Sequence, residues 1–401
     1  MKVAYYFLLA LLVILSVQCS SSKRLLERGN YYEAVMEATD KLRRSPKNKK
    51  AQTALRQAYP LAVEQLLNDV DQAKSTRATF QWSIAADSYR SLNTMFDAIK
   101  TSPAARGVIT HPKDFHEQYG QVRNKAAEEQ YQAGEQAMRE NTIESARQAY
   151  FHYQQAGEYV ANYKDANQKM IEAQEAGTLK VLVEAQPVPS RYYQVSGDFF
   201  YDQVDGFLRN YQQRNQFIAF YTPQELQRQG SVPPDHVLRL RFEDFVVGQS
   251  RTLVKEKTVT ADSVKVGEVE VAQQRPKTRT LSRDVTQVST SGKTVKKPVY
   301  GTVSAKLITT RMEITSGGIL GVLITDTNQR RLLQDDLQGE HIWFAEWGRF
   351  QGDERALNEE ELALCNLPEA VPPPPQQLFV EFTKPLYDQL TDRLNRFYQN
   401  Y

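Results

Sequence analysis

The stretch "TLKVLVEAQPV", Thr178–Val188, separates two parts of the sequence that have different periodicities. Apolar, mostly β-branched residues alternate here with other residues, and a period of two predicts a strand. The preceding residues 24–177 are rich in Ala, Glu, Gln, Lys and Leu, which favour helices. We therefore predict an α+β chain, with an all-α array over residues 24–177 and a strand-rich α/β domain with long hairpins over residues 178–368.

The helical part begins with "RGNYYEAVMEATDKLRRSPKNKKAQTALRQAY", residues 28–59, which resembles a tetratricopeptide repeat. The matching residues are those that such a repeat uses for packing, because small residues sit where helices cross and proline stops a helix. They are Gly29, Tyr31, Ala34, Pro46, Leu55 and Tyr59. Further helices are predicted over residues 61–74, 80–103, 126–141, 142–160 and 162–177, with a C-cap at Gly177 and a loop insertion over residues 102–120. The resemblance implies either a concave surface for a peptide or protein, or a rigid spacer.

The strand-rich part contains a predicted amphipathic helix over residues 199–213 and strands over residues 217–222 and 236–247. We predict one or two long hairpins over residues 249–299. Further strands are predicted over 299–314, 318–326, 330–337 and 341–350, with Gly317 and Gly318 as a turn. A helix over 353–365, a proline-rich connector over 369–377 and a terminal segment over 378–401, mainly an amphipathic helix packing on the α/β domain, complete the chain.

The predicted hairpin region is basic, since residues 249–299 contain eleven Lys and Arg against five Asp and Glu. The arm carries Arg275, Lys277, Arg279, Arg283, Lys293, Lys296 and Lys297. These side chains suit anionic lipid headgroups, cell-wall polymer or an acidic partner. They also suit a simpler role, in which charges keep an exposed hairpin soluble. Residues 251–266 lack the sustained apolar–polar alternation of a lipid-facing strand.

The N-terminal residues resemble a bacterial lipoprotein signal. Lys2 precedes an apolar run over residues 3–17, which has the length of a signal-peptide core and is too short to span a bilayer as a helix. Cys19 follows, with Gln18 where the lipobox usually has Ala, Gly or Ser, and then the polar stretch "SSSK". The resemblance implies a signal peptide over residues 1–18, lipidation of Cys19 and a tether over 19–23. The other interpretations are an ordinary secretory signal or an uncleaved anchor.

Composition and motifs indicate few kinds of chemistry. The 50 basic and 48 acidic residues give no charge argument for nucleic acid. Two cysteines and five histidines fit neither a disulfide framework nor a zinc pattern, so we predict no metal and no cofactor. "SGKT", Ser291–Thr294, lacks the earlier glycine of a phosphate-binding loop, because that position is Gln287. We predict that the chain is not an enzyme.

The strand-rich arrangement resembles periplasmic α/β domains of envelope lipoproteins, including the curli secretion-channel family. Together with Cys19, this implies an outer-membrane lipoprotein that faces the periplasm, because Ser20 is not the acidic residue that retains such proteins in the inner membrane. The predicted function is a non-enzymatic interaction or assembly scaffold, with the membrane and other envelope proteins as partners. The alternatives are a subunit of an oligomeric secretion or channel complex and an enzyme acting on envelope polymers.

Overall fold

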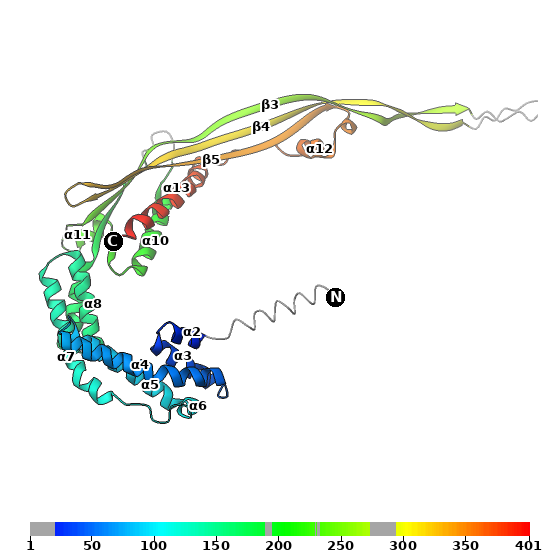
Figure 1. Cartoon of the computed structure of the whole chain (residues 1–401). Coiled ribbons are helices and arrows are strands. Elements are labelled where there is room, and N and C mark those ends of the chain that lie inside the picture. The colour runs from blue at the N-terminus through cyan, green and yellow to red at the C-terminus, as the bar shows by residue number, and fades with distance from the viewer. Residues whose placement is uncertain (1–20, 189–194, 229, 231–232, 273–293) are drawn as a thin grey trace, which may run out of the picture. The chain divides into compact units, whose positions relative to one another are not determined.

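The computed structural model describes residues 21–188, 195–228, 230, 233–272 and 294–401. A helical array comes first and a mixed five-stranded sheet with a long hairpin and a C-terminal helix follows, so the predicted α+β class is confirmed (Figure 1). Contacts divide the chain into two compact units, with the boundary between Leu179 and Lys180. The predicted signal peptide, Cys19 and most of the basic arm lie outside the described residues.

The first unit begins with helices that share one apolar core. Their bounds are Ser21–Glu27 (α2), Tyr31–Arg44 (α3), Lys49–Thr76 (α4), Gln81–Thr101 (α5) and Pro103–Arg106 (α6). Fully buried Ala34 and Ala38 on α3 face buried alanines and leucines of α4 and α5. Small side chains at these positions let the helix axes approach closely, while Leu42 and Leu55 fill the gaps.

Helix α4 is one continuous helix of 28 residues, although two helices were predicted on either side of Pro60. A proline inside a helix removes one backbone hydrogen bond and clashes with the preceding turn. The residues on both sides of it, including Ala58, Ala62 and Val63, are buried against neighbouring helices. This burial stabilises the helix through the proline, because tertiary packing outweighs local propensity.

The predicted insertion at residues 102–120 is only partly a loop. The side chain of Ser102 accepts a hydrogen bond from Ala105 N and caps α6, and the next helix, α7 (His116–Arg139), begins inside the insertion. Two backbone donors fix the loop to other helices: Lys113 N donates to Tyr59 Oη at 2.7 Å, and Phe115 N donates to Asn93 Oδ1 at 3.0 Å.

The unit closes with α8 (Ile143–Tyr159) and α9 (Ala166–Gly177). Gly177 is the last residue of α9 and Thr178 is its C-cap, so the predicted glycine C-cap is wrong by one residue. The glycine matters for a close approach instead. A Cβ there would lie 2.9 Å from Arg147 Cγ, and Arg147 Nε donates a hydrogen bond to Gly177 O at 2.8 Å.

The second unit is built on a sheet with the strand order β2-β1-β3-β4-β5. Its strands are Leu179–Ala185 (β1), Ile218–Tyr221 (β2), His236–Ala272 (β3), Thr294–Asp326 (β4) and Arg331–Gly352 (β5). Its helices are Asp198–Arg214 (α10), Pro223–Arg228 (α11), Glu359–Cys365 (α12) and Pro375–Tyr398 (α13), and a short 3-10 helix covers Glu354–Ala356 (η1). Strand β1 is parallel to β3, whereas β3, β4 and β5 form an antiparallel meander.

Strands β3, β4 and β5 are longer than the sequence predicted. The predicted turn at Gly317 and Gly318 is wrong, because β4 runs unbroken from Thr294 to Asp326. Residues 330–337 and 341–350, predicted as two strands, belong to the single strand β5. Within the described residues of the predicted hairpin region, β3 and β4 pair with each other as far as Ala272 and Thr294, and we call the described residues of β3, β4 and β5 the ribbon (Figure 1).

Helices α13 and α12 cover different faces of the ribbon. A Cβ at Gly339 would lie 2.5 Å from Phe382 O of α13, and a Cβ at Gly348 would lie 3.1 Å from Cys365 Sγ of α12. These glycines are nine residues apart on β5, so they point to opposite faces. Helix α13 contributes an aromatic core in which Phe379 lies 5.4 Å from Phe242 and 5.1 Å from Phe382, measured between ring centroids.

Helix α13 begins at Pro375, where proline is well placed in a first helical turn, so the predicted connector over 369–377 overlaps its start.

None of the helices in the described part of the chain has both the length and the apolarity to cross a membrane.

Candidate interaction surface

The ribbon has two long edges that no described strand pairs with. Strand β1 covers β3 only over His236–Leu240, and β3 continues to Ala272. On the other side, β5 is the last strand of the sheet. Open edges present backbone donors and acceptors to another chain, and proteins usually protect them. The ribbon therefore offers two templates for backbone pairing within the described residues.

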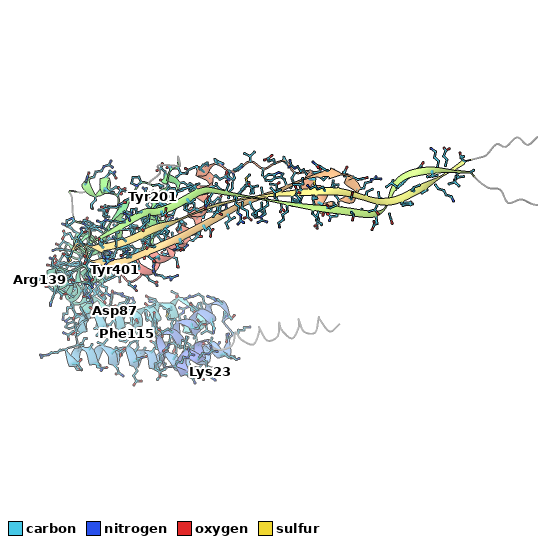
Figure 2. The ribbon with its side chains drawn as sticks, turned by 90° about the horizontal axis from the view of Figure 1, so that it is seen from above. Lys23, Asp87, Phe115, Arg139, Tyr201 and Tyr401 are labelled. Carbon is cyan, nitrogen blue, oxygen red and sulfur yellow. The ribbon has the colours of Figure 1, made fainter. Side chains whose placement is uncertain are left out.

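Exposed apolar side chains accompany these edges. Ten of the eighteen large apolar residues that are exposed in the described part of the chain belong to the ribbon: Val246, Val254, Val266, Val269, Val271, Val295, Val299, Tyr300, Ile342 and Phe344. Figure 2 shows side chains along both faces of the ribbon. Exposed apolar side chains at this density along one structural element are consistent with contact to another molecule.

The centre of this surface is a cation–π contact. The Arg311 guanidinium lies 4.6 Å from the centre of the Phe344 ring, and Arg311 Nε donates to Glu313 Oε1 at 2.7 Å. Glu313 and Phe344 are directly opposite each other on β4 and β5. The exposed fractions are 57% for Phe344 and 53% for Ile342, two residues away on the same face. Aromatic side chains and arginine are enriched at protein interfaces.

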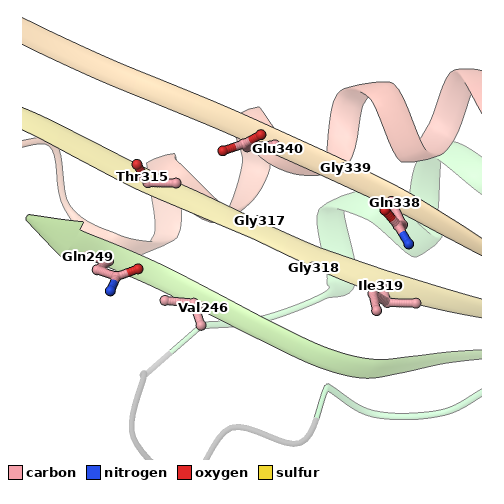
Figure 3. A pocket seen from close by; sticks show the side chains of 9 residues that line it. All are labelled: Val246, Gln249, Thr315, Gly317, Gly318, Ile319, Gln338, Gly339 and Glu340. Carbon is pink, nitrogen blue, oxygen red and sulfur yellow. The ribbon is translucent and has the colours of Figure 1, made fainter.

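A shallow hollow of about 560 Å³ adjoins this contact (Figure 3). Its floor is formed by Gly317, Gly318 and Gly339, and its rim by Val246, Gln249, Thr315, Ile319, Gln338 and Glu340. A Cβ at Gly318 would lie 2.7 Å from Phe245 Cβ, so the glycine is required where β3 comes close. Strand β3 is bulged here, and Gly248 has a left-handed φ of 80° with its N–H donating to Ser316 Oγ.

The rim of the hollow carries groups that can recognise a ligand. Its rim combines apolar Val246 and Ile319 with the amides of Gln249 and Gln338, which donate and accept hydrogen bonds. Among the described residues there is no cluster of three or more His, Cys, Asp or Glu side chains placed to hold a metal ion. Cys365 is partly buried, and burial raises the pKa of its thiol, which disfavours the reactive thiolate.

The structure brings only two residues of the basic arm into the described ribbon. Lys296 pairs with Glu270 and Lys297 with Val269 across β3 and β4. Arg275, Lys277, Arg279, Arg283 and Lys293 lie outside the described residues. The described part of the arm therefore has one lysine opposite a glutamate and one opposite a valine, and neither lysine lines the hollow.

The residues predicted for helical-repeat packing lie in the other unit. Gly29 has a left-handed φ of 81° just before α3, Tyr31 is its first residue, and Ala34 is fully buried. Pro46 follows the end of α3, and Leu55 and Tyr59 lie buried on α4. Burial raises the pKa of Tyr59. All six residues shape helix junctions and none lines the hollow on the ribbon.

The Arg311–Phe344 contact is absent from the sequence predictions. The segment "HIWFAEW", residues 341–347, contains a pattern from which exposed large side chains could have been predicted. Ile342 and Phe344 alternate with His341 and Trp343, so both faces of the strand carry large side chains. An edge strand of this kind, with one face packed on the core, exposes the large side chains of its other face.

Comparison with known proteins yields no match to a family model, a curated protein or a solved structure.

Proposed function

We propose that this chain is a membrane-anchored envelope lipoprotein that acts as a non-enzymatic interaction or assembly scaffold. The observation that supports the scaffold role is the ribbon, with its two open edges and its exposed Phe344 and Ile342. The sequence around Cys19 supports the lipid anchor, because acyl chains attached to a cysteine hold a protein at a bilayer.

The ribbon suits recognition of an extended partner. A peptide that adds a strand to a sheet edge gains backbone hydrogen bonds, and alternate side chains provide the specificity. Beside the β5 edge, Phe344 and Ile342 provide an apolar contact, and Glu340 and Gln338 provide polar groups on the same strand. A partner strand that presents apolar side chains opposite Ile342 and Phe344, and polar side chains opposite Gln338 and Glu340, matches this pattern.

A crosslinking pull-down from intact cells tests the proposal. The double substitution Ile342→Lys and Phe344→Lys places two charges on the exposed contact without emptying a core. A matched control is Phe151→Lys with Ile171→Lys, since these side chains are 50% and 54% exposed on the helical unit. We expect recovery of crosslinked partners to fall at least tenfold for the ribbon variant and to stay unchanged for the control.

The two variants also separate the ribbon from the helical array. Equal recovery from the ribbon variant and the unsubstituted chain would refute the role of the ribbon. Loss with the control variant alone would assign partner binding to the helical array, as the tetratricopeptide resemblance implies.

A second candidate is a subunit of an oligomeric envelope secretion or channel complex. The two open edges belong to different strands, β3 and β5, and pairing of β3 of one copy with β5 of the next would be head-to-tail. Head-to-tail contacts of identical subunits build rings or filaments. Native mass in detergent tests this candidate: a multiple of the chain mass that collapses to one chain on Phe344→Lys favours it, and a single chain at all concentrations excludes it.

A further inference from the structure

A basic hollow lies between α2, α3 and α4 in the helical unit. Its volume is about 900 Å³. Leu26, Ala51 and Ala54 supply apolar surface to it. Its charged lining consists of one carboxylate, Glu27, and four lysines: Lys23, Lys41, Lys49 and Lys50. We call this site the α2–α4 hollow; Lys23 at its margin is labelled in Figure 2.

The charge around the hollow is strongly positive. Residues 21–50 contain nine Lys and Arg against four Asp and Glu, whereas the whole chain has a formal net charge of only +2. The Lys23–Glu27 and Lys41–Glu37 ion pairs, at 3.6 and 3.1 Å, each join residues four apart on one helix. Such exposed pairs are weak and easily exchanged for a stronger anion.

Helix α4 adds to this positive potential. Its first turn carries Lys49 and Lys50 and no acidic residue, and the N-terminus of a helix has a partial positive charge. Asn48, which also lines the hollow, caps the helix by accepting from Ala51 N at 3.1 Å. Lysine charges and a helix N-terminus together favour a phosphate or carboxylate ligand.

The location of the hollow favours a phosphate at a bilayer surface. Ser22 lines it, and Cys19 lies three residues earlier in the chain. Three residues span at most about 11 Å. This step depends on the proposed function: if acyl chains on Cys19 enter a bilayer, the hollow lies within reach of the headgroups, where each basic residue gains from an anionic surface.

We infer that the α2–α4 hollow binds the phosphate headgroup of an anionic phospholipid. Lys23, Lys49 and Lys50 contact the phosphate, and Leu26 and Ala54 contact the glycerol and the first methylenes. The hollow thereby gives the protein a second membrane contact beside its lipid, and two weak attachments together hold a protein far longer than either alone.

The test uses the full chain in micelles of a neutral detergent, with native mass spectrometry to count bound lipid. The probes are phosphatidylglycerol, phosphatidylcholine, inorganic phosphate and a peptide of aspartate and glutamate. The variant combines Lys23→Gln, Lys49→Gln and Lys50→Gln. The control combines Lys255→Gln, Lys296→Gln and Lys297→Gln on the ribbon, which removes the same charge elsewhere.

We expect selective binding of phosphatidylglycerol over phosphatidylcholine, a loss of affinity of about a hundredfold in the hollow variant, and no change in the control. Equal binding by the hollow variant would overturn the inference. Binding of inorganic phosphate as tight as that of phosphatidylglycerol would reduce the hollow to a general anion site, and preference for the acidic peptide would assign it to a protein partner.

The same measurement on Cys19→Ala separates this inference from the proposed function. Lipid counts in micelles do not require an acylated cysteine. Selective phosphatidylglycerol binding by a chain whose Cys19 carries no lipid therefore supports the hollow while the anchor fails, and the reverse result rejects the hollow and leaves the anchor standing.

Discussion

At the scale of single residues, glycine has opposite roles at two positions of the second unit. Gly339 is buried beneath α13, and a Cβ there would lie 2.5 Å from Phe382 O and 2.7 Å from Leu386 Cγ. Gly206 lies within α10 with no heavy atom within 4 Å of an added Cβ. The first position needs glycine for contact between elements, and the second does not.

We expect Gly339→Ala to destabilise the protein by about 1–3 kcal/mol, because α13 must move away from β5. Gly206→Ala is the matched control and should stabilise by about 0.5–1 kcal/mol, because alanine favours a helix. Chemical denaturation followed by the fluorescence of Trp343 and Trp347, both on β5, measures the two values. Equal effects of both substitutions would contradict the close contact in the structure.

His236 is a buried residue at the start of β3. The exposed fraction of its side chain is 5%, and its Nδ1 has no hydrogen-bond partner. Its ring lies among Phe397, Tyr398 and Tyr401, the last at 4.9 Å between centroids. Burial lowers the pKa of His236 below its usual value, although the carboxylates of Asp235 and Asp326 act in the opposite direction.

This burial makes stability depend on pH. The folded chain binds a proton at His236 less readily than the unfolded chain, in which the imidazole is protonated below about pH 6.5. Stability is therefore present above that pH and falls as the pH drops from 7 to 5, by at most about 1.4 kcal/mol per pH unit for this group. We expect His236→Phe to flatten this dependence in denaturation measurements at pH 7 and pH 5. An unchanged pH slope would show that folding does not change the pKa of His236.

At the scale of elements, α5 shows how a helix can be started by a distant side chain. Its N-cap is Phe80, with a left-handed φ of 62° and no capping side chain. Glu129 of α7 takes over this role: its Oε2 accepts from Ser83 N at 2.9 Å and from Ser83 Oγ at 3.0 Å. A local pattern search expects Ser, Thr, Asp or Asn at the N-cap and finds none here.

We expect Glu129→Ala to cost about 1–2 kcal/mol in thermal or chemical denaturation, because buried N–H groups of the first turn of α5 lose their acceptor. The control is Glu158→Ala on α8, which removes only an exposed contact with Gln154 and should change stability by less than about 0.5 kcal/mol. Similar losses for both variants would argue against capping by Glu129.

The element scale also shows which sequence predictions hold. The helices predicted over residues 126–141 and 142–160 correspond to α7 and α8, although α7 begins ten residues before the predicted start and both helices end one or two residues before the predicted ends. The predicted turn at Gly317–Gly318 was wrong because glycine signals both turns and close approach, and only the bulged neighbour β3 distinguishes the two. The exposed contact between Arg311 and Phe344 depends on the register of β4 with β5, which no local pattern contains.

At the scale of the whole molecule, the proposed lipid at Cys19 determines where the protein acts. We expect Cys19→Ala to prevent incorporation of radiolabelled fatty acid and to move the protein from the membrane to the soluble fraction of a cell lysate, because acylation adds about 0.8 kcal/mol per buried methylene. Cys365→Ala is the control and should leave fractionation unchanged. Full membrane retention of Cys19→Ala, with no label in the unsubstituted chain, would contradict a lipid anchor.

The sequence by itself determined the α+β class, the change from helix to strand near Thr178 and the presence of long hairpins, because periodicity reflects which face of each element is buried. Only the tertiary structure decided that α4 continues through Pro60, that Glu129 caps α5 and that β4 continues through Gly317 and Gly318. Each of these outcomes depends on a contact with residues far away in the chain, whose free energy exceeds the local preference for a break, a cap or a turn.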